Sequence, residues 1–225
     1  MLISFEGLPG TGKTTQVQLL AEHLRSDGTR AYALPDLAGL TTDDTGQRLS
    51  ELFAISGDPF KRTGDVTTDT FLAAAIRANI HATSIQPALN AGYTVIEDRG
   101  AHTMYSYSLA GILRHHRTDP LAAIAWLKAC GALAGPEADI SVLLRLSPDR
   151  AAARVARRPG SGQAWNDEQR AFLGYVSKAY EHLEHADTCL IAINVEDLTP
   201  AEVHAAVYQL ITSHPHCAGQ QRESP

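Results

Sequence analysis

The sequence predicts an α/β fold with a five-stranded, mostly parallel sheet and helices on both faces. Five short apolar runs alternate with longer segments of helical periodicity, which is the pattern of α/β proteins. The runs are rich in Ile, Val and Leu, as expected for strands that are covered on both sides. The predicted strands are Leu2–Phe5, Arg30–Leu34, Tyr93–Glu97, Ile140–Leu146 and Cys189–Ile193.

Eight helices are predicted between and after these strands. Ser147 before Pro148 and Thr199 before Pro200 each indicate an N-cap residue followed by proline at the first helical position. The predicted helices are Lys13–Ser26, Thr45–Ile55, Thr70–Ala91, Ala101–Arg114, Pro120–Ala134, Pro148–Arg157, Asp167–His185 and Pro200–Thr212.

Three segments interrupt this alternation: a polar loop at Asp36–Asp44, a turn-rich connection at Gly57–Asp69, and a glycine-containing link at Arg158–Asn166. The length of 225 residues fits one domain, which we place at 1–213 with a short lid at about 154–166. The polar residues 214–225 are expected to form a disordered tail.

Composition restricts the classes of function. Hydrophobic residues make up 44% of the chain and charged residues 20%, which excludes a largely disordered protein. A net charge of −6 argues against broad binding of nucleic acid or of anionic membranes. The three cysteines are widely spaced, and the N-terminus lacks a signal-peptide pattern, so we expect a reducing, cytoplasmic setting.

One motif points directly to chemistry. Residues 7–14 read Gly-Leu-Pro-Gly-Thr-Gly-Lys-Thr, which fits G-x-x-x-x-G-K-[ST]. A predicted strand leads into this loop and a predicted helix begins at Lys13, so backbone N–H groups and a helix N-terminus face a polyphosphate. Lys13 would reach the β and γ oxygens, and the Thr14 hydroxyl would join the Mg²⁺ shell. The motif predicts binding of ATP with Mg²⁺, by Gly7, Leu8, Pro9, Gly10, Thr11, Gly12, Lys13, Thr14 and Thr15.

Other sequence features bear on what happens to the nucleotide. A signalling GTPase would carry Asn-Lys-x-Asp, and the chain has none. A motor-type ATPase would be larger and would carry more acidic residues after its third strand. The third predicted strand here ends in Asp98-Arg99. At the carboxyl edge of a parallel sheet, Asp98 would face the metal and Arg99 an anionic acceptor, although an ordinary surface ion pair is the alternative. A small kinase is favoured.

Several stretches resemble the thymidylate kinase family of nucleoside monophosphate kinases. They are Phe5-Glu6-Gly7 before the phosphate loop, Arg77 in the segment 71–79, Gln86-Pro87-Ala88-Leu89 with Asp98-Arg99 closing the same stretch, and Tyr107 nine residues after Asp98. An arginine-bearing link before an aromatic helix completes the series. The resemblance covers most of residues 1–212 and implies a P-loop NTPase fold.

The resemblance implies roles for individual residues. Arg77 and Arg99 would hold the acceptor phosphate, with Asp98 beside the metal. Tyr107 would lie beside the acceptor nucleoside, and Arg154, Arg157 and Arg158 would begin a lid over the γ-phosphate. Each has a plainer alternative: Arg77 as a helix residue that snorkels from the core, Tyr107 as a core residue, and the lid arginines as a solvated face. The resemblance also implies a homodimer formed through the long helices.

The chain departs from the family where the acceptor is read. Pro9 replaces an acidic residue of the phosphate loop that helps to hold the acceptor sugar in the family. After the second predicted strand, residues 34–39 replace the family's Arg-Glu-Pro-Gly pattern, and only Asp36 could substitute for its acid. Ala73 stands where an aromatic residue commonly faces thymine, with Phe71 out of phase, and Ser108 replaces a glutamine. The residues that handle phosphate are better preserved than those that read thymidine.

The sequence therefore predicts ATP-dependent phosphoryl transfer to a nucleoside monophosphate, dTMP to dTDP, with Lys13, Asp98, Arg99, Arg157 and Arg158 as catalytic residues and Asp36, Arg77, Arg99 and Tyr107 on the acceptor. Two alternatives stay open. One is a kinase of a different nucleotide or small molecule, for which Asp36 or Glu97 would be the candidate base. The other is a nucleotide-binding switch without catalysis.

Overall fold

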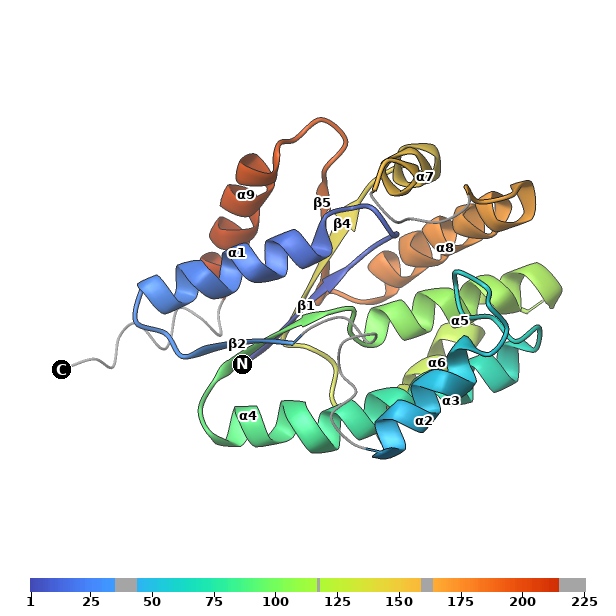
Figure 1. Cartoon of the computed structure of the whole chain (residues 1–225), viewed down its shortest axis with the longest axis horizontal. Coiled ribbons are helices and arrows are strands. Elements are labelled where there is room, and N and C mark those ends of the chain that lie inside the picture. The colour runs from blue at the N-terminus through green and yellow to red at the C-terminus, as the bar shows by residue number, and fades with distance from the viewer. Residues whose placement is uncertain (35–43, 117, 159–163, 215–225) are drawn as a thin grey trace.

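The computed structural model describes residues 1–34, 44–116, 118–158 and 164–214. Its centre is one five-stranded sheet whose hydrogen-bonded pairs are all parallel, in the order β2-β3-β1-β4-β5 (Figure 1). The strands are β1 (Leu2–Glu6), β2 (Ala31–Leu34), β3 (Thr94–Asp98), β4 (Ile140–Arg145) and β5 (Leu190–Asn194). All five predicted strands are confirmed, with ends displaced by one residue. Every residue of β1 and β3 is buried, including the polar residues at their carboxyl ends, Glu6, Glu97 and Asp98.

Helices cover both faces of the sheet. Helices α1 and α9 lie against one face, while α5 and α8 pack together on the other, with α3 and α6 outside them (Figure 1). No helix in the described part of the chain is long and apolar enough to cross a membrane. The α-helices are α1 (Lys13–Ser26), α2 (Asp44–Ala54), α3 (Val66–Ile80), α4 (Gln86–Asn90), α5 (Ala101–His115), α6 (Pro120–Leu133), α7 (Pro148–Ala156), α8 (Asp167–Ala186) and α9 (Pro200–Ser213).

The helix predicted at Thr70–Ala91 differs in its start and its interior. It begins at Val66, because the Asp65 side chain accepts a hydrogen bond from the Thr68 N–H and caps the helix one turn earlier. Between α3 and α4 the chain makes a π-helical turn, η2 (His81–Ile85). Pro87 has no N–H with which to continue the α-helical ladder, and the π turn lies just before it.

The two predicted proline caps have different outcomes. Thr199 forms a complete capping box with Glu202, as the sequence suggested. Ser147 occupies the N-cap position of α7, but its side chain makes no capping bond. Its backbone N–H instead donates to a carboxylate oxygen of Glu196 at 2.5 Å, and Arg150 of α7 pairs with the same carboxylate. The first turn of α7 is thus attached to the segment that follows β5.

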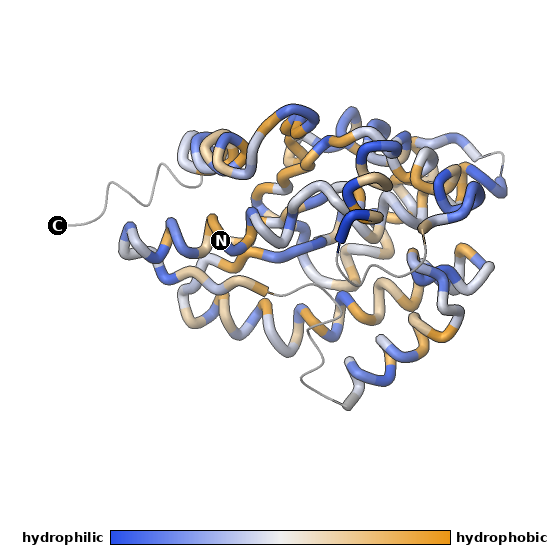
Figure 2. The backbone as a smooth tube through the Cα atoms, turned by 45° about the horizontal axis from the view of Figure 1, so that its top comes forward, coloured by the Kyte–Doolittle hydropathy of each residue, from blue (hydrophilic) through white to orange (hydrophobic). Residues whose placement is uncertain are grey.

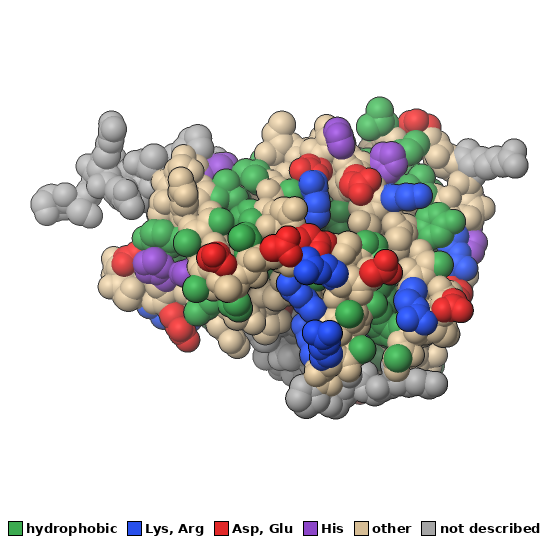
Figure 3. All heavy atoms as spheres, turned by 90° about the horizontal axis from the view of Figure 1, so that it is seen from above, with side chains coloured by type: hydrophobic (Ala, Val, Ile, Leu, Met, Phe, Trp, Pro, Cys, Tyr) green, Lys and Arg blue, Asp and Glu red, His purple; other side chains and the backbone are tan. Residues whose placement is uncertain are grey.

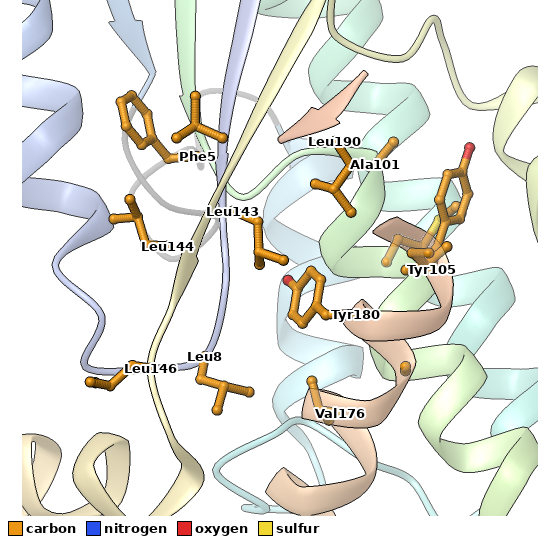
Figure 4. Packing of buried hydrophobic residues seen from close by; sticks show 14 of the residues in the cluster. Phe5, Leu8, Ala101, Tyr105, Leu143, Leu144, Leu146, Val176, Tyr180 and Leu190 are labelled. Carbon is orange, nitrogen blue, oxygen red and sulfur yellow. The ribbon is translucent and has the colours of Figure 1, made fainter. Parts of the chain in front are cut away.

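The hydrophobic core lies along both faces of the sheet, and it contacts the loop that follows β1. Apolar residues gather on the strands and the inward sides of the helices (Figure 2). Leu8, in the loop after β1, is buried beside Leu146 and Val176 in the core (Figure 4). Tyr180 of α8 reaches the same region, and its hydroxyl accepts a hydrogen bond from the Gly7 N–H at 3.1 Å. The loop between β1 and α1 is therefore anchored in the core through Gly7 and Leu8.

Candidate active site

The loop between β1 and α1 has the backbone of an anion-binding turn. Gly7, Gly10 and Gly12 all have positive φ angles, which glycine adopts without strain. Two of these glycines also lie against neighbouring backbone. A Cβ at Gly7 would lie 2.5 Å from the carbonyl oxygen of Leu144, and one at Gly10 would lie 2.8 Å from that of Ala151. The glycine positions of the motif thus have a conformational and a packing reason, and α1 begins immediately after them.

Lys13, Thr14 and Asp98 meet at the end of this loop. The Lys13 ammonium is buried and donates to the carbonyl oxygens of Gly7 at 3.0 Å and Leu8 at 2.9 Å. The Thr14 hydroxyl donates to Asp98 Oδ2 at 2.5 Å. An aliphatic hydroxyl and a carboxylate side by side are hard oxygen ligands of the kind that Mg²⁺ prefers. The residues that the motif and strand β3 predicted separately therefore lie together.

Glu6 joins three elements beneath this group. Its buried carboxylate accepts hydrogen bonds from the Gly100 N–H at 2.9 Å and from the Thr103 hydroxyl at 2.6 Å. Gly100 is the N-cap residue of α5, two residues after the end of β3, and Thr103 lies in the first turn of α5, whereas Glu6 ends β1. Glu6 therefore sets the position of the Asp98–Arg99 turn relative to the phosphate loop.

Arg99 occupies a strained turn. Its φ angle is +77°, a value that non-glycine residues seldom adopt. Its N–H donates to the carbonyl oxygen of Phe5 at 3.0 Å, which holds the turn against β1. Backbone strain of this kind persists where the surrounding structure enforces it, commonly at ligand sites. Arg99 is half-buried and lines the large cavity described below.

Arg77 of α3 is buried against Glu97 of β3. Its Nη1 lies 3.2 Å from Glu97 Oε2, and its Nη2 donates to the carbonyl oxygen of Pro136 at 2.9 Å. Burial raises the pKa of the Glu97 carboxyl, and the Arg77 charge opposes this shift. Arg77 is thus a paired residue at the cavity wall and is not a snorkelling residue of the helix surface.

A cavity of about 610 Å³ lies beside Asp98 and the two arginines. It begins at Pro9 of the phosphate loop, passes Arg77, Asp98 and Arg99, and extends between α3, α5 and α8. Tyr107 lines it while its ring also packs on Phe172, with centroids 6.2 Å apart. Tyr107 thus packs against the core and also faces the cavity, and its place beside the acceptor nucleoside stays a prediction. One cavity runs from Asp98 and the two arginines to an aromatic wall.

The aromatic wall comes from residues that the sequence did not single out as a group. Phe60 lies 5.2 Å from Trp165 and 5.6 Å from Phe172, measured between ring centroids. Arg62 stacks on the Phe172 ring at 4.3 Å. Phe60 and Arg62 stand in the turn-rich connection before α3, whereas Trp165 and Phe172 flank the start of α8. No local pattern connects these segments, so only the folded chain shows the wall.

A charged network closes the far end of the cavity. Glu168 pairs with Arg62 at 2.9 Å and also with Arg114 of α5. These hydrogen bonds from Arg62 and Arg114 lower the pKa of Glu168 to about 2, so the carboxylate is ionised at neutral pH. Glu168 thus ties three segments together at this end, namely α8, α5 and the connection before α3, within which Arg62 also pairs with Asp58.

The departures from the family pattern also appear in the cavity. Ala73 and Ser108 line the wall formed by α3 and α5. Phe71 points elsewhere: it is exposed and packs edge-on against Trp126 of α6, with ring centroids 6.2 Å apart. Phe71 is out of phase with position 73 on the helix, and, as this predicted, it does not replace the missing aromatic residue in the cavity. Four aromatic residues of the cavity lining instead pack together on the wall that contains Phe60, Tyr107, Trp165 and Phe172.

The remaining predicted residues lie apart from the cavity lining. Arg157 and Arg158 are exposed at the end of α7. Arg154 donates to the carbonyl oxygen of Val195 at 3.3 Å and contributes to the contact between α7 and the end of β5. Thr15 is exposed at the start of α1. Asp36 and residues 159–163 of the predicted lid lie outside the described residues, as does the tail from 215.

A second polar cluster lies beneath α5, outside the cavity lining. His102, Glu137 and Asp187 bring three possible metal-ligand atoms within 4.8 Å of one another. The Lys128 ammonium lies among them, 2.6 Å from Asp187 Oδ2 and 3.4 Å from Glu137 Oε2. Hydrogen bonding from His102 lowers the pKa of Asp187 despite its burial, and Lys128 adds to this effect. The Lys128 ammonium already pairs with both carboxylates, so this cluster is a half-buried ion-pair network.

Comparison with known proteins decides the family. The family model for thymidylate kinase matches residues 5–207, which includes the phosphate loop, Arg77, the Asp98–Arg99 turn and α8. The chain belongs to the thymidylate kinase family. A thymidylate kinase of Ruegeria pomeroyi is 31% identical over 189 residues, which cover 81% of this chain and 82% of that protein. One of Synechococcus is 31% identical over 211 residues, or 94% of each chain.

The thymidylate kinase family fold is also seen in solved structures. The structure of the thymidylate kinase from Candida albicans has a TM-score of 0.67 and 24% identity, and the match covers 94% of this chain and 91% of that one. The five-stranded parallel sheet with flanking helices is thus the P-loop fold that the sequence predicted. Figure 3 shows the molecule from the top of the view in Figure 1. On this face, basic and acidic side chains lie next to one another.

Proposed function

We propose that this protein transfers the γ-phosphoryl group of ATP to a nucleoside monophosphate, with dTMP as the acceptor. The observation that carries the proposal is the cavity that runs from Pro9 of the phosphate loop, past the Arg77 and Arg99 side chains, to the aromatic wall. A nucleoside monophosphate has the matching order of groups: a phosphate at one end and a flat, partly apolar base at the other. The names of the family and of the relatives support dTMP as this acceptor.

Thr14 and Asp98 would hold Mg²⁺. The oxygens of these two residues already share a hydrogen bond of 2.5 Å, so one cation placed beside them would meet both. When bound, Mg²⁺ neutralises charge on the β- and γ-phosphate oxygens. The loop supplies backbone N–H groups and the Lys13 ammonium on the same side. Lys13 now rests on two loop carbonyls, which are weaker partners than phosphate oxygens, so it can turn to the nucleotide.

Catalysis by these residues consists of alignment and charge neutralisation. The acceptor oxygen belongs to an anionic phosphate, so no strong general base is required. Asp36 and Glu97 are the candidate bases for a hydroxyl acceptor. Asp36 lies outside the described residues, and both oxygens of Glu97 lie within hydrogen-bonding distance of Arg77. The pairing of Glu97 favours an acceptor that already carries phosphate. Arg99 would hold that phosphate in line with the γ-phosphate.

The lid belongs to the proposal as well. Arg157 and Arg158 are exposed at the end of α7 and stand next to the segment that leads to α8. We place them over the γ-phosphate when the segment at about 154–166 closes. Trp165 supports this placement from the other end, because it already packs on Phe60 in the aromatic wall. Closure would exclude water, which otherwise competes with the acceptor for the phosphoryl group.

We expect ADP release to depend on the acceptor. With ATP and Mg²⁺, dTMP should stimulate turnover at least about 100-fold over the rate without acceptor, because water is a poorly aligned nucleophile. The measurement is coupled ADP release across the four deoxynucleoside and four ribonucleoside monophosphates. EDTA should abolish the stimulated rate, since the phosphate charge is then not neutralised.

The same panel tests the alternatives. If another monophosphate gives the highest rate, the protein is still a kinase, but dTMP is not its preferred acceptor. Binding of ATP with no stimulation by any monophosphate would contradict the nucleoside monophosphate kinase and leave a kinase of another small molecule or a nucleotide-binding switch.

A homodimer is the second part of the proposal. Trp126 and Leu133 on α6 and Phe71 on α3 are exposed apolar residues on neighbouring helices, which contact each other. Such a surface on a small chain is typical of a protein interface. We expect the double variant Trp126→Glu, Leu133→Glu to sediment as a monomer at concentrations where the unaltered chain is a dimer. An unaltered chain that sediments as a monomer at every concentration would contradict this proposal.

We also propose a cytoplasmic location. Cys130 and Cys189 are free thiols in the structure, which is typical of a reducing compartment.

A further inference from the structure

The surroundings of Arg77 suggest a role for Glu97 that the kinase reaction alone does not require. The Arg77 and Glu97 side chains are only 7% and 5% exposed. Nη1 and Nη2 of Arg77 face Glu97 and the Pro136 carbonyl oxygen, whereas its Nε is buried without a partner in the described structure. Glu97 and the Pro136 carbonyl oxygen therefore already accept hydrogen bonds from the two Nη atoms of Arg77. Only its Nε lacks a hydrogen-bond acceptor in the described structure.

The cavity as a whole has little excess positive charge with which to hold a phosphate. Its described lining contains five cationic side chains, Lys61, Arg62, Arg77, Arg99 and Arg114, and five carboxylates, Asp58, Asp69, Glu97, Asp98 and Glu168. An incoming phosphate therefore has to compete with these carboxylates for its partners. At Arg77 the competitor is Glu97, which is buried and lies next to Glu6: a Cβ at Gly100 would lie within 3 Å of both carboxylates, at 2.3 Å and 2.9 Å.

We propose that Glu97 is an internal competitor of the acceptor phosphate for Arg77, and that it limits how tightly phosphate-bearing ligands are held. This inference rests on the proposed function, in which Arg77 binds the acceptor phosphate. When the phosphate enters, it takes hydrogen bonds that Glu97 makes in the free protein. When the product leaves, Glu97 takes them back.

The inference has a functional consequence. The diphosphate product carries more negative charge than the monophosphate acceptor, so a cluster of unpaired arginines would hold the product more tightly than the substrate. Binding that stabilises ligands uniformly does not accelerate the chemical step, and slow product release limits turnover in many enzymes. A carboxylate that returns to Arg77 offsets this tendency.

The test is the variant Glu97→Gln, compared with the unaltered protein by calorimetric titration of dTMP and of thymidine. Gln keeps the length of the side chain and a carbonyl oxygen for Arg77, but it removes the negative charge. We expect the Kd for dTMP to fall about tenfold, the order of one charge-assisted hydrogen bond made available to the ligand. The Kd for thymidine, which has no phosphate, should stay within about twofold of the original value. The Kd for dTDP should fall at least as much as that for dTMP.

Glu168→Gln is the matched control. It makes the same chemical change in the same cavity, but Glu168 contacts Arg62 and Arg114 instead of Arg77. This variant should shift the Kd values of dTMP and thymidine by the same factor. If Glu97→Gln fails to fold, Glu97→Met, also uncharged and of similar length, makes the same comparison.

The sign of the effect separates the inference from the alternative. A weaker or unchanged affinity for dTMP in the Glu97 variants would overturn the inference, because a carboxylate that merely orients Arg77 helps the ligand. The proposed function fails separately: it is lost if no nucleoside monophosphate stimulates ADP release from the unaltered protein. If the unaltered protein phosphorylates dTMP but Glu97→Gln has an unchanged Kd for dTMP, the proposed function stands and the competition between Glu97 and the phosphate is contradicted.

Discussion

Replacing Lys13 with Met should lower kcat/KM for ATP by about 10³-fold or more, which is the scale of losing one preorganised charge at a transferring phosphoryl group. Met has a similar length and no charge, so the change removes the ammonium and keeps most of the packing. The ammonium is buried at the mouth of the loop, where water cannot take over its role. Most of the loss should appear in kcat, because the backbone N–H groups of the loop still bind the nucleotide.

Two measurements check this prediction. Steady-state kinetics with ATP and dTMP give kcat and KM, and thermal unfolding reports whether the variant is folded. Lys178→Met is a suitable control, because Lys178 is an exposed lysine on α8, away from the cavity lining, and its kinetics should match those of the unaltered protein. A folded Lys13→Met variant with kcat within about threefold of the original would show that the lysine does not act on the transferring phosphate.

Much of the fold is predictable from the sequence because its signals are local. Each strand contains a short run rich in apolar residues, and the central strands β1 and β3 are buried along their whole length. The start of α3 was misplaced for a local reason of a different kind. Asp65 lies in a segment rich in turn residues, and only its hydrogen bond to the Thr68 N–H shows that it caps a helix. The π turn before Pro87 has no periodic signal at all.

The site divides in the same way. The phosphate loop is contiguous, so its residues and their roles follow from a single motif and the elements on either side. The aromatic wall is formed by Phe60, Trp165 and Phe172. Phe60 lies more than 100 residues before the other two in the sequence, so no local spacing connects them. The pairing of Arg77 with Glu97 across 20 residues is likewise a product of tertiary structure. Sequence reasoning identified both residues but not their contact.

Arg99→Ala should lower kcat/KM for dTMP by about 10²–10³-fold while changing the KM for ATP by less than about threefold. The reason lies in the position of Arg99: it lines the cavity on the acceptor side of Asp98, at a turn that Glu6 and Phe5 hold in place. Backbone strain does not confuse the result. Alanine at a φ of +77° is strained in the same way as arginine, so the two proteins differ mainly in the guanidinium.

Arg99→Lys sharpens this test. Lysine restores the charge but not the planar fork that binds two phosphate oxygens at once, so it should recover only part of the lost activity. Arg170→Ala on α8 is the matched control, because Arg170 is a half-exposed arginine paired with Asp167 and lies outside the cavity lining. Unchanged turnover of dTMP by Arg99→Ala would remove Arg99 from the acceptor site. In that case Arg77 would be left as the arginine for the acceptor phosphate, and the competition with Glu97 would then govern acceptor affinity more strongly.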